Sequence, residues 1–188
     1  VDNVCQIKPR TDWDNTYIPH GINEKNFYPM NESHKDWGEL MQFKRNVTDG
    51  KDYKFIVFWN NRNIRRKLPG DVILAFKHFR SLLPDDKKDD VALVMHTQIV
   101  DNNGTDLRAI HENVAPECKI LFSENKVGAK ELNALYNVAD VTINIASNEG
   151  WGLSSTESLL AGTPIINNVT GGLQDQCRFE NEKGEWIT

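Results

Sequence analysis

From residue 53 onward, short apolar runs alternate with segments whose apolar residues recur at helical spacing. The runs predict strands buried on both faces, and the periodic segments between them predict helices. We expect strands at residues 53–59, 91–96, 120–122, 141–145 and 164–167, with helices at 72–83, 106–114, 132–139 and 155–161 between them. Regular alternation of strand and helix is typical of a parallel sheet with helices on both faces. The sequence therefore predicts an α/β fold with a doubly wound parallel sheet.

The first fifty residues differ from the rest, because they are polar, irregular and interrupted by Pro9, Pro19 and Pro29. A short strand is expected at Tyr17–Ile18 and a short helix at residues 37–43. We therefore divide the chain into an irregular lead-in at residues 1–50 and an α/β domain at residues 51–188.

Composition narrows the class of protein. With 39% hydrophobic and 26% charged residues, the 188-residue chain resembles an ordinary globular protein of one domain. Its net charge of −5 argues against nucleic acid as a main partner. The three cysteines form no pair at metal or disulfide spacing, which favours a reducing compartment and a cytoplasmic location. No run approaches the ~20 apolar residues that span a bilayer.

Two carboxylates flank the loop after the strand at residues 141–145. Glu149 precedes Gly150, and Glu157 falls near the start of the next helix, with Gly152 between them. Open α/β sheets bind ligands at this place, where free helix amides favour a negative group. The amides of Gly152 and Leu153 are therefore candidates for holding an anionic ligand.

Each of these residues also has a plain structural explanation. Glu157 completes the capping-box pattern that begins at Ser154, and on sequence alone this is as good as a ligand role. Trp151 is as readily a core anchor as a wall of the site. The basic run that holds Arg62 and Lys67 is typical of a solvated face, although its position just after a buried strand favours binding.

Motifs in five places resemble the retaining glycosyltransferases of family 4. Glu149 and Glu157 match their Glu-x7-Glu motif, and Arg62 and Lys67 match the basic pair of Gly-Arg-Leu-x-x-x-Lys-Gly. Asn61, Asn63 and Leu68-Pro69 depart from that second pattern, which leaves the loop conformation open. The remaining matches are the lobe-entry segment 17–23 with Phe27, then Glu131-Leu132, Leu135-Tyr136 and Ala139-Asp140, and the later pair Gly171-Gly172.

The resemblance implies a Rossmann-like domain, the C-terminal, nucleotide-sugar-binding lobe of a two-lobed GT-B enzyme. It implies that Glu149 contacts the transferred sugar, that Glu157 binds the ribose, and that Arg62 and Lys67 stabilise the leaving diphosphate without a metal or cofactor. Gly150, Trp151, Gly152 and Leu153 would line the donor site. The acceptor is unknown (a sugar, lipid or protein), and a missing N-terminal lobe would hold most of it, so we expect the isolated chain to bind donor without transferring sugar. Peripheral membrane contact through the full-length protein stays open.

Two other functions remain. A nucleotide-sugar epimerase of the same two-lobed fold would share the sheet but should not need the Glu-x7-Glu spacing. A non-catalytic nucleotide- or sugar-binding module would keep the fold and could lose the charged residues, whereas Arg62, Lys67, Glu149 and Glu157 are all present.

Overall fold

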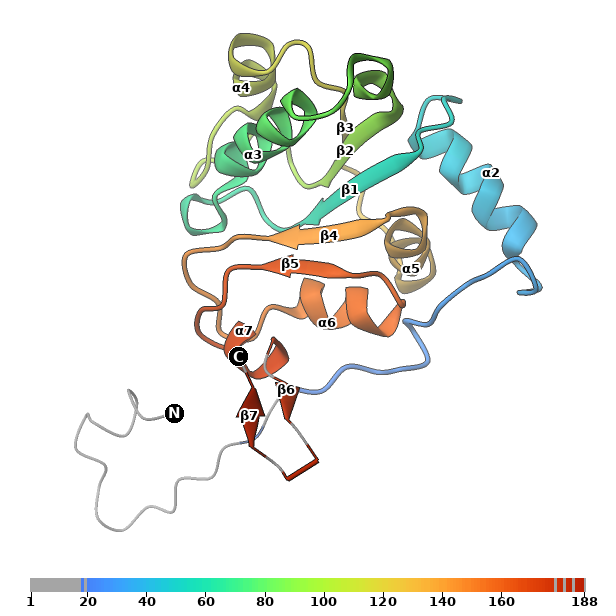
Figure 1. Ribbon diagram of the computed structural model, residues 1–188, viewed down its shortest axis with the longest axis vertical. Coiled ribbons are helices and arrows are strands. Elements are labelled where there is room, and N and C mark those ends of the chain that lie inside the picture. Colours follow the sequence, from blue (N-terminus) through green and yellow to red (C-terminus); the bar gives the residue numbers. More distant parts are fainter. Residues whose placement is uncertain (1–17, 19, 178, 181, 184, 188) are drawn as a thin grey trace.

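The computed structural model describes residues 18, 20–177, 179–180, 182–183 and 185–187. Its centre is a five-stranded parallel sheet in the order β3-β2-β1-β4-β5, which runs from the upper to the lower part of Figure 1. The strands are β1 (Phe55–Asn60), β2 (Val91–His96), β3 (Ile120–Ser123), β4 (Val141–Asn144) and β5 (Ile165–Asn167). The helices are α2 (Trp37–Val47), α3 (Pro69–Ser81), α4 (Leu107–Val114), α5 (Ala129–Val138), α6 (Leu153–Leu160) and α7 (Leu173–Gln176), with short 3-10 turns η1 (Arg65–Lys67) and η2 (Asp85–Asp90).

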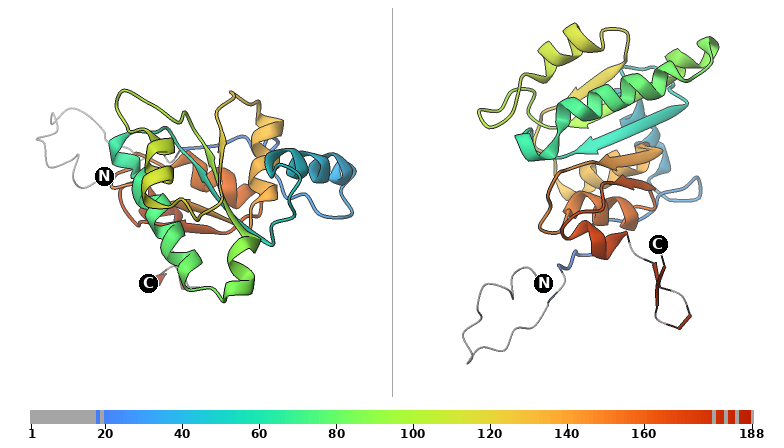
Figure 2. Two further views of the ribbon diagram at one scale, coloured as in Figure 1. Left: turned by 90° about the horizontal axis from the view of Figure 1, so that it is seen from above. Right: turned by 60° about the vertical axis from the view of Figure 1, so that its left-hand side comes forward.

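The chain winds outward from β1 in both directions. It passes through α3 and α4 to reach β2 and β3, and then returns along α5 to place β4 on the other side of β1. Helices α3 and α4 cover one face of the sheet, while α2 and α5 cover the other (Figures 1 and 2). The doubly wound α/β fold predicted from the sequence is confirmed.

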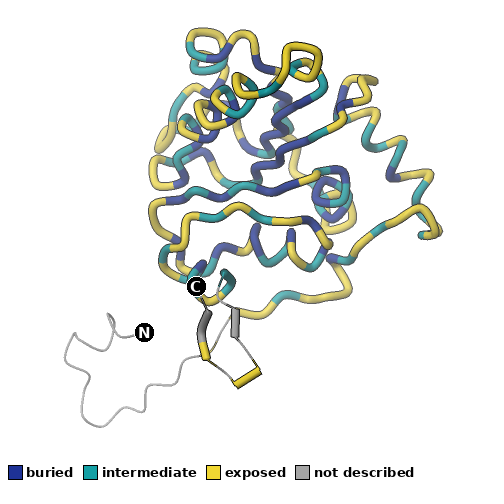
Figure 3. The backbone as a smooth tube through the Cα atoms, viewed as in Figure 1, coloured by how far each residue is buried: buried dark blue, intermediate teal, exposed yellow. Residues whose placement is uncertain are grey.

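Strand β1 supplies both faces of the core, because successive side chains of a strand point to opposite sides. Val57 and Trp59 join the cluster beneath α3 and α4, whereas Ile56 and Phe58 join the cluster beneath α2 and α5. Burial is highest along β1 and β2 and falls toward the edge strand β5 (Figure 3). The central strand is thus held from both sides, which fixes the loop that leaves its carboxyl end.

The segment before β1 packs on this domain. Helix α2 confirms the helix expected at residues 37–43 and extends it to Val47. Asn133 and Asn137 of α5 accept hydrogen bonds from the amides of Tyr28 and Met30 at 3.0 and 2.6 Å, which fastens the strand-free segment before α2. Ile18 lies outside any strand, and Tyr17, with the rest of residues 1–17, lies outside the described residues. The lead-in role of residues 1–50 stays a prediction.

A two-stranded antiparallel hairpin, β6 (Phe179–Glu180) and β7 (Trp186–Ile187), follows α7 and stands apart from the sheet (Figures 1 and 2). Across the part of the chain that the structure describes, no helix has the length and apolarity to cross a membrane.

Candidate functional site

A cavity of about 430 Å³ opens where β1 and β4 end. These strands are neighbours in the sheet although β2 and β3 separate them in sequence, so the chain leaves them toward opposite faces. Such a switch point leaves a crevice at the carboxyl edge of a parallel sheet, and ligands of open α/β proteins bind there. The lining residues come from the end of β1, both loops, α5, α6 and the segment before α2: His20, Asn60, Asn61, Arg66, Lys67, Leu132, Glu149, Gly150, Trp151, Gly152, Leu153, Ser154 and Glu157.

The β1–α3 loop presents two of its basic residues to this cavity. The 3-10 turn η1 carries Arg66 and Lys67, and Leu68 then turns the chain into α3 with φ 52° and ψ 45°. This left-handed conformation costs an ordinary residue roughly 1–2 kcal/mol. Pro69 begins α3 without loss, since the first amide of a helix has no intrahelical partner.

Asn63 ties this loop to the β2–α4 loop at residues 98–105. Its fully buried side chain donates to the carbonyl oxygens of Ile99 at 3.0 Å and Thr105 at 2.7 Å. A β-carbon on Gly104 would collide with the backbone of Asn63, so the two loops can only approach this closely at a glycine. Contacts with the β2–α4 loop therefore hold the β1–α3 loop in place.

Glu149 is the centre of the site, with 5% of its side chain exposed. Lys67 Nζ donates to Glu149 Oε1, and Arg66 Nη1 donates to Oε2 at 3.0 Å. Burial raises the pKa of Glu149, but the hydrogen bonds from Lys67, Arg66 and Asn144 together with the charge of Lys67 outweigh it, so the pKa lies below its ordinary value. Burial also lowers the pKa of Lys67, against the attraction of Glu149. The site thus holds a buried carboxylate between two cations.

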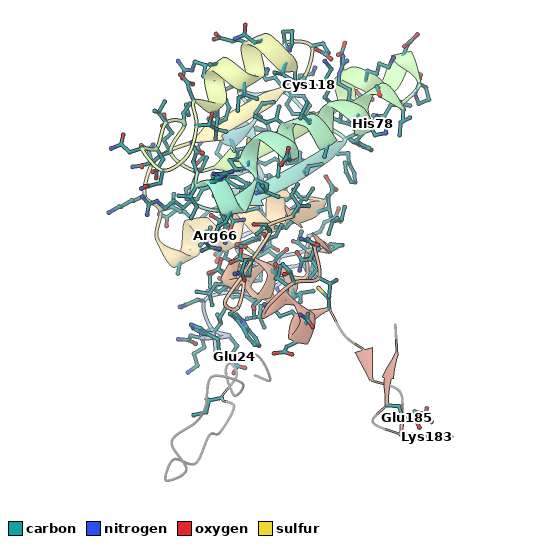
Figure 4. The ribbon with its side chains drawn as sticks, turned by 90° about the vertical axis from the view of Figure 1, so that its left-hand side faces the viewer. Glu24, Arg66, His78, Cys118, Lys183 and Glu185 are labelled. Carbon is teal, nitrogen blue, oxygen red and sulfur yellow. The ribbon has the colours of Figure 1, made fainter. Side chains whose placement is uncertain are left out.

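Both the side chain and the backbone of Arg66 make hydrogen bonds to the loop between β4 and α6. Its side chain also donates to the carbonyl of Asn148 at 2.8 Å, and its own carbonyl accepts from the amide of Ser147 at 2.8 Å. In Figure 4, Arg66 lies beside the start of α3, where the β4–α6 connection passes. The sequence had placed Arg66 within a basic run without choosing it as a site residue.

Arg62, the basic residue expected beside Lys67, lies elsewhere. Its guanidinium donates to both carboxylate oxygens of Asp101, at 2.8 and 3.3 Å, and it is absent from the cavity wall. The hydrogen bonds and charge of the pair raise the pKa of Arg62 and lower that of Asp101. The structure brings Lys67, Glu149 and Glu157 to one cavity. It leaves Arg62, on the same loop as Lys67, paired with Asp101 of the neighbouring β2–α4 loop.

The turn from β4 into α6 depends on Gly152, which has φ 90°. Gly150 has no positive φ, and a β-carbon there would meet no atom within 4 Å, so only the second glycine is needed for the turn. The later pair, Gly171 and Gly172, packs directly on the loop, and the Gly172 amide donates to the carbonyl of Glu149 at 2.9 Å. Larger residues at either position would displace the backbone that carries Glu149.

Glu157 lies one turn into α6, which begins at Leu153 rather than at residue 155. The interpretation of Glu157 as part of a capping box is wrong. The N-cap residue of α6 is Gly152, which makes no side-chain hydrogen bond, and the Ser154 hydroxyl has no hydrogen-bond partner. Glu157 Oε2 instead accepts from the Tyr136 hydroxyl at 2.6 Å. Burial raises the pKa of Glu157, and this hydrogen bond opposes the rise.

The rest of the wall is mixed in character and includes two buried polar atoms without a hydrogen-bond partner. Trp151 is half-buried rather than a core anchor, and its indole nitrogen donates to Thr156 at 2.8 Å. Buried Asn61 Nδ2 and Ser154 Oγ have no hydrogen-bond partner. Leu153 and Ser154 stand in the first turn of α6, where helix amides lack intrahelical acceptors. The cavity wall therefore offers hydrogen-bond donors as well as the carboxylate of Glu157.

No group of three His, Cys, Asp or Glu side chains among the described residues has the geometry of a metal site.

The family model "Glycosyl transferases group 1" matches residues 41–188, which include every element of this site except His20. The chain belongs to this family. The family resemblance inferred from the sequence motifs is therefore confirmed. The expected Rossmann-like lobe of a GT-B fold is also confirmed, because the domain superposes on solved structures of GT-B glycosyltransferases.

Two solved structures and one relative illustrate the similarity. The C-terminal domain of a group 1 glycosyl transferase (LpcC) from Francisella tularensis matches with a TM-score of 0.62 at 17% identity, over 81% of this chain and 72% of that one. Anabaena Alr3699/HepE in complex with UDP-glucose matches with a TM-score of 0.60 at 14% identity, over 82% and 38%. The alpha-monoglucosyldiacylglycerol synthase of Acholeplasma laidlawii is 26% identical over 162 residues. That alignment covers 85% of this chain but only 37% of the relative, so this chain spans little more than a third of that protein's length.

Proposed function

We propose that this domain binds a nucleoside diphosphate sugar in the switch-point cavity and serves as the donor lobe of a retaining, metal-independent glycosyltransferase. The observation that carries the proposal is the convergence of Lys67 and Arg66 on buried Glu149, in the cavity that also holds Glu157. The similarity to HepE, which was solved with UDP-glucose, supports a nucleotide-sugar donor.

The diphosphate belongs beside Lys67 and Arg66. Lys67 and Arg66 share the single carboxylate of Glu149, which carries one negative charge for two positive charges. A diphosphate would supply the additional negative charge. The first turn of α6 adds unpaired amides and the positive end of its dipole at Leu153 and Ser154. These groups stabilise the charge that develops on the leaving diphosphate when the glycosyl bond breaks.

The remaining roles follow the motif match and the cavity wall. Glu149 contacts the transferred sugar, Glu157 receives the ribose hydroxyls, and Gly150 with Trp151 forms the wall between them. Arg62 would reach the diphosphate only by leaving Asp101, so we assign it a smaller share than Arg66. Retention, the acceptor and the second lobe are proposals that rest on the resemblance.

Calorimetry with UDP, ADP and GDP, each beside its free nucleoside, tests the proposal. We expect one diphosphate to bind at least tenfold more tightly than its nucleoside, with no change on adding a metal chelator. The variant Lys67→Met should remove most of that difference while leaving nucleoside affinity unchanged. Lys77→Met is the matched control, because Lys77 lies on α3 away from the cavity and contacts Val114 and Glu117. Equal weakening of nucleoside and diphosphate by Lys67→Met would exclude a phosphate contact.

The two rival functions give different products. An epimerase would exchange the hydrogen at the inverted sugar carbon, so deuterium would enter the free sugar nucleotide in heavy water and be seen by proton NMR. A binding module would bind the same ligands and never give a glycosylated product, even within the full-length protein. We expect no deuterium incorporation, and transfer with retained anomeric configuration by the full-length enzyme.

A further inference from the structure

Three side chains from three elements form one hydrogen-bonded row along the wall of the cavity. Asn60 Nδ2, at the end of β1, donates to the Tyr136 hydroxyl oxygen at 2.9 Å. The Tyr136 hydroxyl, on α5, donates to Glu157 Oε2, on α6, at 2.6 Å. Asn60 and Glu157 both line the cavity, whereas Tyr136 stands behind them.

Tyr136 is held in place by the packing of its ring and by its backbone. The residue is fully buried, and its ring makes edge-on contacts with Phe58 and Phe27 at centroid distances of 5.2 and 6.0 Å. Its backbone carbonyl accepts from the buried Thr163 hydroxyl at 2.7 Å. A side chain packed on all sides cannot follow Glu157 if that carboxylate moves, so Glu157 is held to Tyr136.

The direction of the two hydrogen bonds is set by chemistry. An amide nitrogen only donates, so Asn60 occupies the acceptor side of the Tyr136 hydroxyl and its proton is left for Glu157. Among the described residues, Tyr136 is the one hydrogen-bond partner of the Glu157 side chain. One carboxylate oxygen is therefore fixed, and the other remains for a ligand in the cavity.

We propose that Tyr136 is a positioning residue for donor recognition: it holds Glu157 in the orientation in which the carboxylate accepts hydrogen bonds from the two ribose hydroxyls. The inference rests on the proposed function and names the part of the donor that this row recognises. Burial raises the pKa of Glu157, and the hydrogen bond from Tyr136 opposes that rise and so favours the ionised carboxylate, which can only accept hydrogen bonds. A tyrosine that merely filled the core would have no need of a hydroxyl aimed at a carboxylate in the cavity wall.

The test compares ribose with its dideoxy form. UDP, ADP and GDP are each titrated calorimetrically beside the 2′,3′-dideoxy counterpart, and the best-bound base is used for the variants. We expect wild type to prefer the ribose form at least tenfold, because hydrogen bonds to a charged group are strong. Tyr136→Phe, which keeps the ring contacts, should reduce that preference at least threefold by weakening ribose binding alone. Tyr28→Phe is the matched control, since Tyr28 stacks on His34 outside this cavity, and it should leave the preference unchanged.

The double variant with Glu157→Gln separates positioning from general damage. If Tyr136 acts through Glu157, Tyr136→Phe should add little to the effect of Glu157→Gln. Unchanged preference in Tyr136→Phe, or equal loss of ribose and dideoxy affinity, would overturn the inference and leave the proposed function intact. Equal binding of both forms by wild type would refute the ribose role of Glu157 and the inference with it. If wild type binds no diphosphate, the proposed function itself fails.

Discussion

Replacing Lys67 with methionine tests whether the cations hold Glu149 or merely lie near it. Methionine keeps the unbranched side chain up to the ε position and removes the charged ammonium group. Lys67 has 10% of its side chain exposed, and its ammonium contacts Glu149 and Asn61. After the change, Glu149 keeps Arg66 at 3.0 Å and Asn144 at 3.3 Å but loses the more buried of its two cations.

The expected loss in free energy of unfolding depends on the charge of Glu149, which stays buried after Lys67 is replaced. Breaking a buried ion pair by removing one partner costs about 3–5 kcal/mol, because the remaining charge stays buried. Arg66 still reaches Glu149, so we expect the lower end, about 3 kcal/mol, which lowers the melting temperature of a domain of this size by roughly 6–12 °C. Lys77→Met should cost much less, since 42% of the Lys77 side chain is exposed.

Urea unfolding followed by tryptophan fluorescence measures these free energies, and fully buried Trp59 should report loss of the core. In the double variant Lys67→Met/Glu149→Gln no uncompensated carboxylate remains, so its loss should be about 1–2 kcal/mol smaller than the sum of the single losses. Additive losses would show that Lys67 and Glu149 do not interact. Equal losses for Lys67→Met and Lys77→Met would refute the buried-pair argument altogether.

Three further outcomes can be checked in the same protein. Glu157→Gln should leave the free energy of unfolding at pH 7, measured by urea unfolding, unchanged or higher, because burial raises the Glu157 pKa and so disfavours its ionised form. The same change should lower ribonucleotide affinity, measured by calorimetry. Gly172→Ala should unfold at lower urea concentration and weaken diphosphate binding, because a β-carbon would collide with the Gly150 carbonyl, whereas Gly150→Ala, where a β-carbon meets nothing, should change stability little. The Glu149 pKa lies below its ordinary value of 4.5, so its stabilising contribution is present above that pH and is lost as the pH falls through the lower folded value; the unfolding free energy of Glu149→Gln should therefore change less than that of wild type between pH 5 and pH 3.

The alternation of strands and helices could be predicted because it depends on local periodicity, which each segment carries by itself. The five strands and the helices between them lie where apolar spacing placed them, with ends shifted by a few residues. The start of α6 could not be predicted in this way. Its first residue depends on the left-handed turn at Gly152, which moves the helix start ahead of Ser154 and removes the capping box.

The ion-pair partners of the charged residues could not be predicted from the sequence, because they depend on the tertiary structure. Arg62 and Arg66 occupy one basic run, and nothing local indicates that Asp101, on the neighbouring loop, takes the first while Glu149 takes the second. The contact between Tyr136 and Glu157 likewise joins α5 to α6 across residues that no short motif connects. Sequence reasoning chose Lys67, Glu149 and Glu157 from the family motifs and from their places after a strand or near the start of a helix, where the fold directs side chains to one crevice. The structure places all three in the same cavity, and their functional roles stay a prediction.

Leu68 shows why a departure from a family pattern need not change a loop. The pattern places a glycine directly after the lysine, and the conformation of the loop was therefore open from the sequence. In the structure Leu68 adopts the left-handed conformation that glycine would adopt without strain, at φ 52°. The hydrogen bonds of Asn63 to the next loop and the immediate start of α3 at Pro69 hold it there, and the strain of roughly 1–2 kcal/mol falls on the residue beside Lys67. The glycine of the pattern thus marks a backbone turn, and because the turn is kept, Lys67 still reaches Glu149.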